Sequence, residues 1–155
     1  MRLLPKKTAR ANASRLLPCL AREFLQAGDE ATRTNLDAGK VLPFARSTRK
    51  FCYSLEYFRA CYGDALDSYL KKLQRLQQLQ DEIRDCMRCR EVCQGVKNSS
   101  GHKQLLGALD RHESELLEKL RAEWQNLFRR PGMEKKFLSC LGHPAPAKRA
   151  TRRSR

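Results

Sequence analysis

Apolar side chains recur every three or four residues along almost the whole chain, and this spacing constrains the fold more than any other feature. In an α-helix such a spacing places the apolar side chains on one face, whereas a half-buried strand requires strict alternation. We find no stretch of four or more residues in which alternation describes the sequence better than the helical period. The sequence therefore predicts an all-α protein.

Glycine and proline divide this pattern into segments. The four long helical segments are expected at residues 6–26, 43–62, 64–94 and 100–128. Pro18 should kink or divide the first of them, and Gly28 is a plausible end to it. Pro43 suits the first turn of the second. Loops are expected at 28–41 and 95–101, and a short helical piece at 133–141.

Four amphipathic helices joined by short loops predict an antiparallel four-helix bundle, here over residues 1–141. Residues 142–155 are rich in proline and arginine and are expected to form a disordered basic tail. The longest uninterrupted apolar runs are two to four residues, too short for a membrane span or for the apolar stretch of a signal peptide. A cytoplasmic protein without membrane contact is the expectation.

The charge of the chain is +15, and its distribution is uneven. Residues 1–63 carry 12 basic and 5 acidic side chains, residues 64–128 carry 11 of each, and residues 129–155 carry 9 and 1. Excess positive charge repels itself in a compact fold, and a polyanionic partner would relieve that repulsion. The pattern favours nucleic acid, an anionic membrane face or a phosphate polymer as the partner.

Seven cysteines do not indicate a disulfide framework, because the number is odd and no export signal precedes them. Cys86, Cys89 and Cys93 lie at i, i+3 and i+7 of a predicted helix, a spacing compatible with metal ligation. Zinc needs a fourth ligand, which would have to be His102, His112 or a residue from elsewhere in the chain. Packing in the core is the favoured interpretation, so no metal or cofactor is expected, with the metal alternative left open.

No nucleophile motif accompanies the histidines, so we do not expect an enzyme. The basic residues are more informative, because three of the predicted helices each carry a short row of them on one face. If these rows converge, they form a trough lined with cationic groups. The candidate binding residues are Arg15, Arg22, Arg46, Arg49, Lys50, Lys71, Lys72 and Arg75.

Two stretches of these helices resemble the CHAD domain, the conserved histidine α-helical domain family. The first runs from Arg49-Lys50-Phe51 through Tyr53 and Leu55-Glu56 to Phe58, and the second includes Leu76-Gln77 and Glu82-Ile83-Arg84-Asp85. The resemblance covers roughly residues 8–128. It departs from the family in lacking the name-giving histidine near Leu42 or Pro43. A CHAD domain has two four-helix repeats around a basic cavity, and this chain holds one.

The resemblance implies that the chain binds inorganic polyphosphate without turning it over, and that a homodimer supplies the second repeat. An alternative is a nucleic-acid-associated protein acting through its basic tail. The basic residues of that tail are Lys148, Arg149, Arg152, Arg153 and Arg155. A purely structural helical bundle is a third interpretation, since basic residues usually lie on the solvated face of an amphipathic helix without binding a partner.

Overall fold

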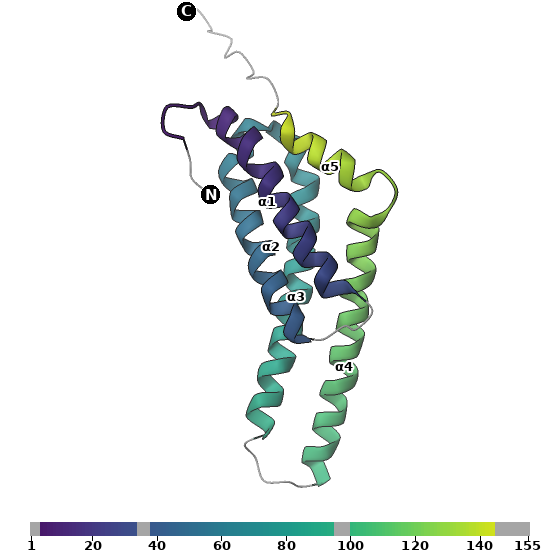
Figure 1. Ribbon diagram of the computed structural model, residues 1–155. Coiled ribbons are helices and arrows are strands. Elements are labelled where there is room, and N and C mark those ends of the chain that lie inside the picture. The colour runs from purple at the N-terminus through teal and green to yellow at the C-terminus, as the bar shows by residue number, and fades with distance from the viewer. Residues whose placement is uncertain (1–3, 34–37, 95–99, 145–155) are drawn as a thin grey trace, which may run out of the picture.

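The structure is a computed structural model, and it describes residues 4–33, 38–94 and 100–144. Within these ranges the regular elements are all helical, so the predicted all-α class is confirmed. The α-helices, shown in Figure 1, are α1 (Ala9–Thr32), α2 (Ala38–Phe58), α3 (Asp67–Gln94), α4 (Ser100–Trp124) and α5 (Met133–Gly142). Short 3-10 turns at Arg59–Cys61 and Gly63–Leu66 join α2 to α3, and a π-helical turn at Gln125–Arg129 extends α4.

The loop predicted over residues 28–41 is wrong, because helix occupies most of it. Gly28 does not end α1, which continues to Thr32. This glycine is buried, and a Cβ built on it would lie 2.2 Å from the indole ring of Trp124. Close packing between α1 and α4 therefore requires glycine here, and no helix end is involved.

The two prolines are accommodated differently from the sequence expectation. Pro18 lies inside α1 and does not divide it. Pro43 lies in the second turn of α2 and not in its first, because that helix already begins at Ala38. Most of the predicted turn at 95–101 and residues 145–155 of the predicted tail lie outside the described residues.

The first four helices run in alternating directions (Figure 1). The second helix, α2, lies between α1 and α3, and α3 pairs with α4. After Pro131 the chain turns at Gly132, whose φ of 80° is left-handed, and α5 then packs against α1. Phe137 and Leu141 of α5 are buried. The short helical piece predicted at 133–141 is thus a fifth α-helix, and five helices in the described residues enclose the core, whereas a four-helix bundle was expected.

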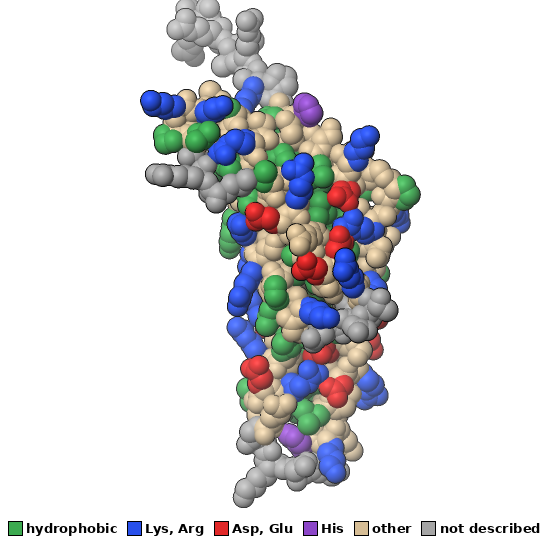
Figure 2. Space-filling view, in the orientation of Figure 1, with side chains coloured by type: hydrophobic (Ala, Val, Ile, Leu, Met, Phe, Trp, Pro, Cys, Tyr) green, Lys and Arg blue, Asp and Glu red, His purple; other side chains and the backbone are tan. Residues whose placement is uncertain are grey.

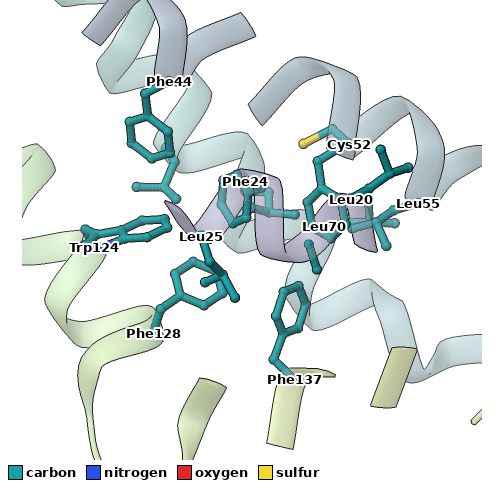
Figure 3. Close-up of a cluster of buried hydrophobic side chains, with 14 of the residues drawn as sticks. Leu20, Phe24, Leu25, Phe44, Cys52, Leu55, Leu70, Trp124, Phe128 and Phe137 are labelled. Carbon is teal, nitrogen blue, oxygen red and sulfur yellow. The ribbon is translucent and has the colours of Figure 1, made fainter. Parts of the chain in front are cut away.

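Aromatic rings form the centre of that core (Figure 3). Phe24 of α1 stacks on Phe51 of α2, with ring centroids 5.1 Å apart, and meets the edge of Trp124 of α4 at 5.2 Å. Phe128 and Phe137 bring the end of α4 and α5 into the same cluster, their centroids being 5.3 Å apart. Truncating such a ring typically costs about 3–5 kcal/mol, so Phe24 is a central contributor to stability.

A buried polar pair sets the register of α2 against α3. The side-chain amide of Gln80 donates to the hydroxyl of Thr48 at 3.0 Å, and that hydroxyl donates to the carbonyl of Phe44 at 2.9 Å. Both polar side chains are almost fully buried, at 0% exposure for Thr48 and 2% for Gln80. Buried polar groups need partners, so this bond favours one alignment of the two helices.

The far halves of α3 and α4 extend past the ends of α1 and α2 as a two-helix projection (Figure 1). Beyond Cys86 in α3 and before Leu116 in α4, the described side chains are half-buried or exposed. Arg90 bridges the two helices there, at 2.7 Å from Asp110 and 2.9 Å from Glu113. None of the helices in the described part of the chain is long and apolar enough to cross a membrane.

Candidate polyanion-binding surface

Adjacent basic residues of α2 turn toward opposite neighbours. Arg49 forms an ion pair with Asp81 of α3, whereas Lys50 pairs with Glu23 of α1, with Nζ and Oε2 2.8 Å apart. Because α2 lies between α1 and α3, these two predicted site residues serve two different helix–helix seams. Arg46, one turn before Lys50, is exposed.

Asp81 holds a second arginine that sequence reasoning missed. Arg84, one turn further along α3, places Nη2 at 3.0 Å from the Asp81 carboxylate that Arg49 also contacts. Two guanidinium groups thus share one carboxylate and leave an excess positive charge. The Nε atom of Arg84 is buried and finds no hydrogen-bond partner among the described residues. The i, i+3 spacing of Asp81 and Arg84 was the available signal for this cluster.

The predicted row on α3 is also divided. Arg75 pairs with Glu123 of α4 at 3.0 Å, so it faces the α3–α4 seam. Lys71 and Lys72 are exposed, and neither makes an ion pair with any residue that the structure describes. The same holds for Arg46. These three cations are available to an external anion without displacing an internal carboxylate.

The predicted residues of α1 lie apart from this group. Arg15 and Arg22 are both exposed. Arg22 lines a hollow that also includes Arg129, which follows α4, and Glu134 of α5, so it is on a side of α1 other than the α2 seam. The eight predicted cations are therefore distributed over several seams of one chain and do not converge in a single trough.

A second charged cluster holds the helices together. Arg129 contacts both Asp29 of α1 and Glu134 of α5, the latter at 2.6 Å, and lies 6.0 Å above the ring of Trp124. Trp124 in turn donates from its indole nitrogen to Asp29 at 3.1 Å. Because its cation, Arg129, already contacts two carboxylates, we assign this cluster to the packing of α1, α4 and α5.

The space-filling view shows how the charges are exposed (Figure 2). Lys and Arg side chains are scattered over the visible face, with acidic groups among them around the middle and a column of cations along one edge. Exposed ion pairs contribute only about 0–1 kcal/mol, so pairs such as Lys50 with Glu23 can open at little cost. The surface is therefore cationic, and its exposed ion pairs can open at little cost when an external anion binds.

Three of the seven thiols have raised pKa values. Burial, reinforced by nearby Glu56, raises the pKa of Cys52 to about 12, and burial likewise raises the pKa values of Cys86 and Cys140. Since the thiolate is the nucleophile and the metal ligand, these three thiols stay protonated and unreactive at neutral pH.

The three cysteines whose spacing suggested a metal site do not share one environment in the structure. Cys86 is buried in the core, whereas Cys89 is exposed and Cys93 is half-buried. Within the described ranges, no group of three or more histidine, cysteine or acidic side chains is placed to hold a metal ion.

Comparison of the chain with protein-family models, with curated proteins and with solved structures finds no match.

Proposed function

We propose that this chain is a non-catalytic binding protein for a linear polyanion, with inorganic polyphosphate as the ligand that fits best. The binding surface is the exposed side of α2 and α3. We call it the α2–α3 surface, and it consists of Arg46, Arg49, Lys71 and Arg84. The observation that carries the proposal is the pairing of Arg49 and Arg84 on the single carboxylate of Asp81.

The charge balance of this surface supports an anionic ligand. It has four cations, of which Arg49 and Arg84 share Asp81, and the other two have no carboxylate partner among the described residues. Arginine offers phosphate oxygens a planar, bidentate fork, and lysine offers a compact charge. Neither interaction needs a catalytic group or a metal of the protein.

The shape of the surface supports a chain-like ligand. Arg84 and Lys71 are thirteen positions apart on α3, which corresponds to about 20 Å at 1.5 Å per residue. A single phosphate cannot span that distance, whereas a polymer of phosphates can engage cations along it. The resemblance of residues 8–128 to one CHAD repeat points to the same ligand and, through the family's doubled architecture, to a homodimer.

The test compares long-chain polyphosphate with double-stranded DNA of equal charge, at 150 mM salt as in roughly physiological conditions. Full-length protein and a 1–143 truncation are titrated side by side. We expect both to bind polyphosphate, with an affinity that falls as salt rises. If removal of residues 144–155 abolishes all binding, the basic tail carries the function and the nucleic-acid alternative is favoured.

Matched variants locate the site. Arg46→Ala with Lys71→Ala should weaken polyphosphate binding, because it removes two exposed cations of the α2–α3 surface. Lys103→Ala with Arg111→Ala removes the same charge from the exposed far part of α4 and should have a much smaller effect. Equal losses in both variants would show that net charge alone drives binding. Light scattering on the wild-type protein tests the homodimer.

A further inference from the structure

A shallow apolar groove lies between α1 and α2, on the side of α2 away from α3. Its floor consists of Leu16 and Leu20 of α1 and Phe58 of α2, and its rim includes Lys50, Tyr53 and Tyr57. The two tyrosines are 68% and 72% exposed. Among the Phe, Tyr and Trp residues that the structure describes, these two are the exposed ones, since the others are buried or half-buried. Packing in the core therefore does not explain why aromatic rings occupy these two positions.

The two rings belong to one continuous face of α2. Arg46, Lys50, Tyr53 and Tyr57 follow at i, i+4, i+7 and i+11, a spacing that places all four on one stripe of a helix. The stripe carries two cations followed by two aromatic rings. Lys50 pairs with Glu23, but both side chains are more than half exposed, at 61% and 54%, so that pair can yield to a phosphate.

The geometry of the rings suits stacking. Tyr53 and Tyr57 are four residues apart, about 6 Å along the helix axis. The ring of Phe58 meets that of Tyr57 edge-on, with centroids 4.9 Å apart and planes at 89°, which restricts the orientation of the exposed ring. A ring that is already oriented loses less conformational entropy when a ligand stacks on it.

We propose that this face binds single-stranded nucleic acid, with successive bases stacked on Tyr53 and Tyr57 and the backbone phosphates on Lys50 and Arg46. Aromatic stacking beside a basic groove is the general means by which proteins hold single strands without reading their sequence. The inference rests on the proposed polyanion-binding function, because Arg46 belongs to both surfaces. Polyphosphate has no base to stack, and a duplex hides its bases, so neither explains the exposed rings.

The extent of the face sets the size of the bound segment. From Arg46 to Tyr57 is eleven residues, or about 16 Å along the helix. This length accommodates only a few nucleotides, so binding should depend little on sequence and strongly on salt.

The experiment separates base stacking from charge. A fluorescent 12-nucleotide oligothymidine and an abasic strand with the same number of phosphates are titrated with the full chain by fluorescence anisotropy. We expect the base-containing strand to bind at least about tenfold more tightly, given the usual strength of base–aromatic stacking. Any contribution of the basic tail is common to both strands and cancels in the comparison.

Variants assign the difference to the two rings. Tyr53→Leu with Tyr57→Leu should remove the preference for the base-containing strand and leave the affinities for the abasic strand and for polyphosphate unchanged. Tyr53→Phe with Tyr57→Phe keeps both rings and should retain the preference. Circular dichroism confirms that each variant is folded, which the exposure of both side chains favours.

Four outcomes would overturn the inference. Equal affinity of the wild-type protein for both strands, with polyphosphate still bound, would refute stacking and leave the polyanion proposal intact. A leucine variant that still prefers bases would place the stacking elsewhere. A leucine variant that changes from dimer to monomer in light scattering would show that the groove is a contact between two copies. Failure to bind any of the three ligands would refute both proposals together.

Discussion

The side chains of Thr48 and Gln80 meet in the buried interface between α2 and α3, where the amide of Gln80 donates to the threonine hydroxyl at 3.0 Å. The next residue on each helix forms the ion pair of Arg49 with Asp81. The buried bond and the surface pair therefore depend on the same register. A shift of α3 by one turn would separate Arg49 from Asp81 and leave the amide of Gln80 without its partner in the core, while Thr48 would keep its bond to the carbonyl of Phe44.

Removing one partner of the buried pair should therefore be more costly than removing both. We expect Thr48→Val to lower the free energy of unfolding by about 1–3 kcal/mol, because the amide of Gln80 then loses its partner inside the core. The double variant with Gln80→Leu should be less destabilised than the sum of the two single variants. Urea denaturation of all four proteins gives the coupling energy, and strictly additive losses would contradict this account.

Two glycines inside helices should respond to alanine in opposite directions. Gly28→Ala places a methyl group against the buried indole of Trp124, and we expect a loss of about 1–3 kcal/mol or more from overpacking. Gly107→Ala meets nothing within 4 Å on the exposed side of α4, so it should stabilise the protein by about 0.5–1 kcal/mol. Thermal unfolding of both variants provides the comparison, and a neutral Gly28→Ala would refute the close contact.

The buried thiol of Cys52 should make the protein less stable at high pH. Its pKa is raised from 9.0 to about 12, so between these values the folded state binds a proton that the unfolded state has released. Stability therefore falls as pH rises through this range, by at most about 1.4 kcal/mol per pH unit from this group. Cys52→Ala should flatten the slope of unfolding free energy against pH. Cys89→Ala, at an exposed position, serves as the control, and identical slopes would exclude a role for the buried thiol.

Neutralising Asp81 should strengthen polyphosphate binding. Asp81→Asn releases Arg49 and Arg84 from their shared carboxylate, and we expect affinity to rise by about threefold to tenfold, the range of one additional charge-assisted contact. Asp85→Asn removes the same charge from an exposed position on α3 and should give a smaller increase. Titration calorimetry of the two variants distinguishes a local effect from a change in net charge. A decrease for Asp81→Asn would show that the carboxylate positions the two arginines for the ligand.

The helices themselves could be predicted because their apolar spacing is a local property of the chain. That spacing places Phe44, Phe51, Leu55 and Phe58 on one face of a helix, and all four are buried. The role of Gly28 could not be found in this way, since it depends on Trp124, which lies 96 positions later in the chain. No pattern in the sequence around Gly28 indicates that it packs against an indole ring.

The contacts of the basic residues likewise depend on parts of the chain that are distant in sequence. Adjacent positions on a helix are about 100° apart, so Arg49 and Lys50 can share a row in the sequence and still face different neighbours. Which carboxylate each one meets is decided by how α1 and α3 are aligned against α2. That alignment depends on core packing and on the buried Thr48–Gln80 bond, neither of which a charge pattern reveals.

The projecting ends of α3 and α4 give these two helices an internal gradient of stability. Their near halves are enclosed by the aromatic core, whereas their far halves are held mainly by each other and by the Arg90 pairs. Backbone amides of α3 beyond Cys86 and of α4 before Leu116 should exchange with solvent through local opening, while those of the near halves exchange only when the whole domain unfolds. Each of these two continuous helices thus belongs to two cooperative units. The boundary lies at Cys86 in α3 and at Leu116 in α4, the outermost buried side chains of the two helices.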